Sequence, residues 1–222
     1  MDLSPDYPSQ RFSRTPPAPM LLDTCAVQHL DTVLTLCGDG RQLDEECARN
    51  LVARYGPDLG AELVALADLS RLLGYNGPPW AVSETSLFEL EQVNGARGAA
   101  LLRWWSDLWH YWHSCQEFFP EIDCSGLGWP QPDVSSSQLA LFKLEAAVPG
   151  HAAPDEPLAL LPDVGDRALV RDAIRAGIPA ILTTDLRSFW SRRRDIYSYG
   201  IEVWRPTDVL RVYQAEIAGT AA

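Results

Sequence analysis

Short apolar runs that alternate with amphipathic segments constrain the fold of this chain more than any other feature. Four runs have the length of a buried strand, at residues 20–22, 80–82, 179–184 and 200–204. Apolar residues at helical spacing predict helices at residues 24–36, 43–55, 59–73, 84–90, 138–147, 163–176 and 206–215. Strands that alternate with helices form a parallel sheet covered on both faces. The sequence therefore predicts an α/β fold, a three-layer α/β/α sandwich around a central parallel sheet.

The length of 222 residues indicates one domain with elaborations. The first residues are polar and proline-rich and lack the apolar stretch of a secretory signal, so we expect them to form a disordered or loosely ordered arm. The arm is expected at residues 1–18. A single domain follows at residues 19–216, with helical insertions at about 40–76 and 95–157. Residues 217–222 are expected to form a tail.

Composition narrows the class of protein. No apolar run approaches the roughly 20 residues that a membrane span needs, so we expect no membrane association. Five dispersed cysteines are an odd number, which favours the reduced thiols of a cytoplasmic protein over a disulfide framework. The formal net charge of −12 is the opposite of the basic footprint that nucleic-acid-binding proteins usually carry.

Four acidic residues are predicted to gather at one edge of the sheet. Asp23 and Asp185 each follow a strand run directly. Parallel strands end at the same edge, where α/β proteins bind their ligands. Glu89 lies on the helix after the second strand, and Asp166 lies in the first turn of the helix before the Asp185 strand. Asp163, about one helical turn before Asp166, is an additional candidate ligand.

Such a cluster has a chemical use. Close carboxylates repel one another unless one is protonated or a cation is shared between them. Oxygen ligands suit Mg²⁺ and Mn²⁺, which orient a phosphodiester, activate water and stabilise the developing charge. This chemistry requires no serine, cysteine or histidine nucleophile, and the four histidines suggest no catalytic arrangement. Taken singly, each acid has a structural explanation as a turn residue, a solvated helix residue or a partner of the helix dipole; their joint order favours a metal site.

The motifs around these acids resemble those of the PIN-domain family. The matching segments are Leu21-Leu22-Asp23-Thr24-Cys25, Val82-Ser83 with Glu89-Leu90, Gly165-Asp166-Arg167-Ala168-Leu169 with Gly177, Ile181-Leu182-Thr183-Thr184-Asp185, and Gly200-Ile201-Glu202-Val203-Trp204-Arg205-Pro206. Each segment is short, and their order carries the resemblance. The resemblance covers most of residues 20–94 and 158–216. It implies a metal-dependent ribonuclease fold, which is found in RNA-processing factors and in the toxins of bacterial toxin–antitoxin pairs.

The resemblance implies an endoribonuclease that binds Mg²⁺ or Mn²⁺ and hydrolyses RNA, with metal-binding and catalytic residues Asp23, Glu89, Asp166 and Asp185. It also implies a homodimer and, for a toxin, a small antitoxin partner. The spans 43–76 and 94–157 are long for a compact toxin. Two alternatives therefore stay open: a non-catalytic RNA-binding or assembly module of the same fold, and a nuclease that acts on structured DNA.

Residues around the fourth acid are candidates for substrate binding. Four arginines closely follow Asp185, at positions 187, 192, 193 and 194. The candidates for substrate binding are Thr184, Arg187, Arg192 and Arg193. Arginines beside a cleft suit phosphate contacts, so we predict that these four residues bind substrate. A solvated charged face is the alternative for the arginines.

The segment 104–115 is rich in tryptophan and histidine. One expectation is that the helix that begins at residue 84 continues past two glycines, Gly95 and Gly98, into the aromatic stretch 101–119. One interpretation is a zinc site, but its spacing matches no common zinc pattern; its ligands would be His110, His113, Cys115 and Cys124. A second is a platform on which RNA bases stack. We favour a third, a helix packed on the core or on a partner subunit.

Overall fold

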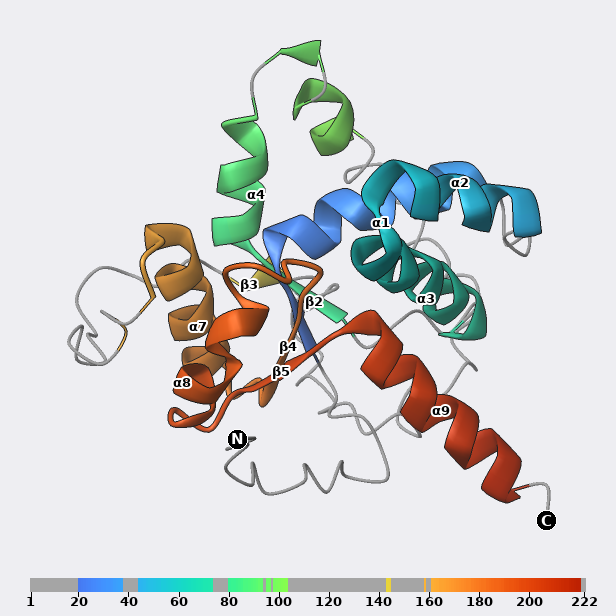
Figure 1. Ribbon diagram of the computed structural model, residues 1–222. Helices are drawn as coiled ribbons and strands as arrows, with labels where there is room; N and C mark the ends of the chain where they lie inside the picture. Colours follow the sequence, from blue (N-terminus) through green and yellow to red (C-terminus); the bar gives the residue numbers. More distant parts are fainter. Residues whose placement is uncertain are drawn as a thin grey trace, which may run out of the picture.

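The computed structural model describes residues 20–37, 44–73, 80–93, 95–96, 98–103, 143–144, 158 and 161–220. Its sheet is parallel and has the strand order β3-β2-β1-β4-β5. The strands are β1 (Met20–Leu22), β2 (Trp80–Ser83), β3 (Lys143–Leu144), β4 (Ala180–Leu182) and β5 (Glu202–Trp204). The predicted mixed α/β fold with a parallel sheet is therefore confirmed (Figure 1).

Helices connect the strands and flank the sheet (Figure 1). They are α1 (Thr24–Cys37), α2 (Glu45–Tyr55), α3 (Pro57–Leu73), α4 (Glu84–Glu91), α7 (Val164–Ala176), α8 (Arg193–Tyr197) and α9 (Pro206–Thr220), with a short 3₁₀ helix at Trp190–Arg192. Polar residues fix several of their ends. The side chains of Asp44, Ser83 and Asp163 each accept a hydrogen bond from a backbone N–H in the first turn of α2, α4 and α7. Gly177 ends α7 at the predicted residue, in the left-handed conformation that glycine adopts readily.

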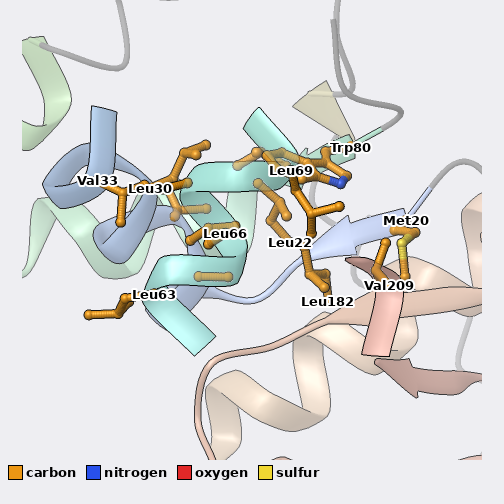
Figure 2. Packing of buried hydrophobic residues seen from close by; sticks show 14 of the residues in the cluster. Met20, Leu22, Leu30, Val33, Leu63, Leu66, Leu69, Trp80, Leu182 and Val209 are labelled. Carbon is orange, nitrogen blue, oxygen red and sulfur yellow. The ribbon is translucent and has the colours of Figure 1, made fainter. Parts of the chain in front are cut away.

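The alternation of side chains along the strands divides the core into two clusters. Leu22 and Leu182 lie in the cluster that also contains apolar residues of α1, α3 and α9 (Figure 2). Their neighbours Leu21 and Ile181 lie in the second cluster, with apolar residues of α7 and α8. Successive side chains of a strand point to opposite faces of a sheet, so helices cover both faces of β1 and β4. Asp23 and Asp185 come shortly after β1 and β4, whose side chains contribute to both clusters.

The structure corrects three sequence-based expectations. The helix that begins at residue 84 ends at Glu91 instead of continuing, because the chain turns at Gln92 and Gly95 has a φ of 82°. Lys143–Leu144 pairs with β2 and is a strand, not part of a helix over 138–147. The helical spacing there is local, whereas strand pairing depends on a distant partner. Helix α9 runs to Thr220, so the expected tail begins inside a helix.

Some expectations fall on residues that the structure does not describe. The arm at 1–18 and the tryptophan- and histidine-rich segment 104–115 lie outside the described residues, as do most of the insertion at 95–157. The insertion at 40–76 is helical where it is described, in α2 and α3. Among the described residues, none of the helices combines the length and apolarity that crossing a bilayer requires.

Candidate functional site

Asp23 lies where β1 ends, on the edge of the sheet that β4 also reaches. Its backbone N–H donates to the carbonyl oxygen of Leu182 at 3.0 Å, which extends the pairing of the two strands by one residue. The side chain is only 5% exposed. Its carboxylate accepts a hydrogen bond of 2.6 Å from the Thr183 hydroxyl and one of 3.3 Å from the backbone N–H of Cys25. The ends of both strands therefore fix this carboxylate.

The surroundings of Asp23 favour its protonated form. Burial raises the pKa of its carboxyl group to about 6, although the hydrogen bonds from Thr183 and Cys25 act in the opposite direction. The negative charges of Asp185 and Glu89 raise the pKa further. Acids from β1, α4 and the end of β4 are thus close enough to repel one another.

Glu89 joins this edge from α4. Its carboxylate accepts a hydrogen bond from the hydroxyl of Thr24, the residue after Asp23. On its other side it lies directly against the backbone of Gly165, where an added Cβ would overlap the Glu89 Oε1 atom. Only glycine therefore fits at this position of α7 without moving the carboxylate. The contact brings the first turn of α7, and with it Asp166, next to Glu89.

Asp166 has the most strongly raised pKa of the four acids, at about 7. Burial is the main cause, and the charges of Asp23, Asp163, Asp185 and Glu89 add to it. Its Oδ2 atom is buried and accepts no hydrogen bond from any described residue. Buried acceptors are nearly always satisfied, so an acceptor of this kind marks a place where a donor or a cation belongs.

Asp185 is held differently from the other acids. One oxygen accepts hydrogen bonds from the backbone N–H groups of Arg187, at 2.9 Å, and Ser188, at 3.0 Å; the other accepts one from the Ser188 hydroxyl. Burial raises the pKa of Asp185, but the hydrogen bonds from Ser188 and Arg187 outweigh it, so the net pKa lies below the ordinary value. Asp185 therefore stays ionised and also organises the turn that follows β4.

The acidic cluster, by which we mean Asp23, Glu89, Asp166 and Asp185, thus combines sequence-predicted residues from four elements. Asp163 lies beside it, but its exposed carboxylate accepts a hydrogen bond of 2.7 Å from the Gly165 N–H and caps α7. No group of three or more His, Cys, Asp or Glu side chains within the described ranges is already arranged to hold a metal ion. The Cys25 thiol lies among the same acids; burial and their charges raise its pKa, so it remains neutral.

The residues predicted to bind substrate have different surroundings. Thr184 is 2% exposed, and its hydroxyl lies 2.7 Å from His29 Nδ1, an interaction that holds α1 against the end of β4. Arg192 forms an ion pair of 3.6 Å with Asp195. The guanidinium of Arg193 lies 4.4 Å from the centre of the Trp190 ring. The side chain of Arg187 is exposed next to Asp185.

Sequence reasoning missed a residue that positions two of the acids. Asp172 is a buried acid on α7 that accepts hydrogen bonds from the hydroxyls of Ser83 and, at 2.7 Å, Thr85. Both hydroxyls lie at the start of α4, so this contact joins the helix of Glu89 to the helix of Asp166. The available signal was the place of Asp172 between apolar residues of the buried face of α7, which is unusual for an unpaired acid.

Gly165→Ala should weaken binding of a divalent cation to the acidic cluster, because the added methyl group displaces the Glu89 carboxylate. We expect the dissociation constant for Mn²⁺, measured by isothermal titration calorimetry, to rise by about tenfold or more, which corresponds to ~1.4 kcal/mol. In a Glu89→Ala background the methyl group has room, so the same substitution should change the affinity little. An equal loss in both backgrounds would mean that Gly165 acts through something other than Glu89.

The acidic cluster is therefore built from the ends of β1 and β4 and the facing turns of α4 and α7. Its members differ in charge state, with Asp185 ionised and the carboxyl groups of Asp23 and Asp166 holding protons up to near neutral pH. The chain matches no family model, no curated protein and no solved structure.

Proposed function

We propose that this protein is an endoribonuclease that depends on Mg²⁺ or Mn²⁺ and has the three-layer α/β/α arrangement of a PIN-like domain. The observation that carries the proposal is the buried Oδ2 atom of Asp166, which lacks a hydrogen-bond donor among the described residues and lies within the repulsive field of four other acids. The order of the acids along the chain and the helices on both faces of the sheet support the same interpretation.

The donor set fits a hard divalent cation. All four members of the cluster offer carboxylate oxygens, the ligands that Mg²⁺ and Mn²⁺ prefer. A cation would satisfy Asp166 Oδ2 and would neutralise the repulsion that, together with the larger effect of burial, raises the pKa of Asp23 and Asp166. The neutral thiol of Cys25 offers no thiolate that would favour a softer metal.

Each residue then has a defined task. The hydroxyl of Thr183 holds Asp23 in place, and the hydroxyl of Thr24 does the same for Glu89. Asp185 contributes a permanent negative charge. When bound, the cation would supply water activation and stabilisation of the charge that develops on the phosphate. Arg187, which is exposed and lies next to Asp185, would contact a neighbouring phosphate of the RNA.

The net charge of −12 is compatible with RNA as the substrate if the cation offsets the acids locally. Positive charge follows the fourth acid closely, in Arg187 and in the exposed Arg192 and Arg194. The expected protein partners are a second copy of the chain, in a homodimer, and a small antitoxin protein.

A pool of end-labelled RNAs tests the proposal. Purified wild-type protein should cut a subset of them in Mn²⁺ or Mg²⁺ and none in EDTA. Sequencing the new ends would give the position of the cut. RNA binding without any cleavage in either metal, by protein shown to be folded, would replace the nuclease with a non-catalytic binding module; cleavage that persists in EDTA would exclude a metal-dependent mechanism.

A further inference from the structure

A cleft between α4 and α7 adjoins the acidic cluster at Glu89. It encloses about 820 Å³, a size typical of small-molecule sites. Glu89 belongs both to the cluster and to the lining of the cleft, and Gly165 lies in the lining next to Asp166. A substrate that spans the acidic cluster therefore has this cleft beside its reacting bond. The two helices stand next to each other in Figure 1.

Large apolar side chains are exposed in the lining of this cleft. Phe88, from α4, is 62% exposed, and Val164, from α7, is 68% exposed. One therefore comes from each of the two helices that form the cleft. Keeping such side chains in water is unfavourable, and covering them would gain about 25 cal/mol for each Å² of apolar surface. A phenyl ring also offers a flat face on which another planar ring can stack.

The charges in the cleft exclude phosphate as its occupant. Three carboxylates line it, those of Glu89, Glu91 and Asp163. None of the described lining residues is lysine, arginine or histidine. A phosphate group would be repelled there, whereas a neutral planar group would not. The exposed amide of Gln92 and the carboxylates offer hydrogen-bonding groups for the edge of such a ring.

We propose that this cleft is a nucleobase subsite, in which a base that flanks the cleaved bond stacks on Phe88. The inference rests on the proposed function, because RNA supplies the base. The phosphate next to this base lies at the acidic cluster, and the base enters the apolar, acidic cleft. Aromatic side chains bind single-stranded RNA in this way, and stacking tolerates several bases, with hydrogen bonds adding preference.

A binding experiment tests the subsite without requiring cleavage. Short RNAs carry the fluorescent base 2-aminopurine at successive positions and are mixed with protein in Ca²⁺. Stacking on Phe88 should quench the fluorescence at one position, and Phe88→Ala should abolish the quenching while Phe88→Trp preserves it. Tyr197→Ala removes another exposed aromatic side chain, on α8 and outside this cleft, and should leave the quenching unchanged. Equal quenching by wild-type and Phe88→Ala protein would overturn the subsite.

A cleavage experiment makes the second test. Phe88→Ala should lower kcat/KM by about 10- to 100-fold, the range that stacking of one base provides. An RNA with an abasic residue at the quenched position should lose the same factor with wild-type protein and nothing further with Phe88→Ala. Losses that multiply would overturn the subsite while leaving the nuclease intact. Conversely, quenching that depends on Phe88, without cleavage of any RNA, would keep the subsite and exclude the nuclease.

Discussion

Asp23→Asn should reduce RNA cleavage by about 1,000-fold while leaving the fold intact. The expected loss follows from the several kcal/mol of transition-state stabilisation that a bound divalent cation supplies, at ~1.4 kcal/mol for each factor of ten. Asparagine has the shape of aspartate and retains a carbonyl oxygen that can accept the hydrogen bond from Thr183. It removes the negative charge that a cation needs at the carboxyl edge of β1.

The fold should tolerate this substitution because burial already makes the charge of Asp23 unfavourable. Since its pKa is raised to about 6, the ionised carboxylate is destabilising near neutral pH, and a neutral amide removes that cost. Initial cleavage rates and thermal unfolding should be measured on the same preparations. Asp58→Asn, an exposed acid at the start of α3, is the control and should retain full activity. A folded Asp23→Asn protein with wild-type rates would remove Asp23 from the catalytic site.

The positions of the acids could be predicted from sequence where they depend on strand ends. Asp23 and Asp185 follow apolar runs, and parallel strands bring such ends to one edge. The surroundings of each acid could not be predicted, because they depend on contacts between distant segments. Asp185 accepts hydrogen bonds from the N–H groups of Arg187 and Ser188. These bonds require the turn after β4, a region for which the sequence predicted no element. No donor from the described residues reaches Asp166 Oδ2, and its burial also removes it from water.

Contacts between elements explain the remaining differences. From the sequence alone, Asp172 has the pattern of an ordinary helix acid. Its role depends on the packing of α7 against α4, which brings Ser83 and Thr85 to it. Lys143 and Leu144 have neighbours at helical spacing, yet the free edge of β2 gives them backbone partners. In both cases a partner more than 50 residues away in sequence determines the contacts of the residue, and the local sequence pattern does not show that partner. Local elements are thus more predictable here than the polar contacts that position the acids.

Asp166→Asn should stabilise the metal-free protein at pH 8 and remove most of its stabilisation by Mn²⁺. The folded protein holds the Asp166 proton up to a pKa of about 7, against an ordinary value of 3.8. Between these pH values the folded state binds more protons than the unfolded state, so the free energy of unfolding falls as the pH rises. Asp23, with a pKa of about 6, acts in the same direction. The wild-type protein without metal should therefore be more stable at pH 5 than at pH 8.

The substitution by asparagine removes the Asp166 share of this pH dependence. At pH 8 and in EDTA we expect the variant to be more stable than wild type by about 1–2 kcal/mol, a value reduced from the full shift because the side chain is only partly buried. At pH 3, below both pKa values, the two proteins should unfold at nearly the same urea concentration, because the wild-type carboxyl group is then mostly protonated in both states.

Mn²⁺ should reverse the order of stability at pH 8. A cation present at 100 times its dissociation constant stabilises the protein that binds it by about 2.7 kcal/mol. Wild type should gain this amount in urea unfolding followed by circular dichroism, and Asp166→Asn should gain much less because one ligand is lost. Asp195→Asn alters a partly exposed acid on α8 that pairs with Arg192, and this variant should show the full gain from the metal. A variant that is destabilised in EDTA at pH 8, yet gains as much from Mn²⁺ as wild type, would show that Asp166 stabilises the fold and does not bind the cation.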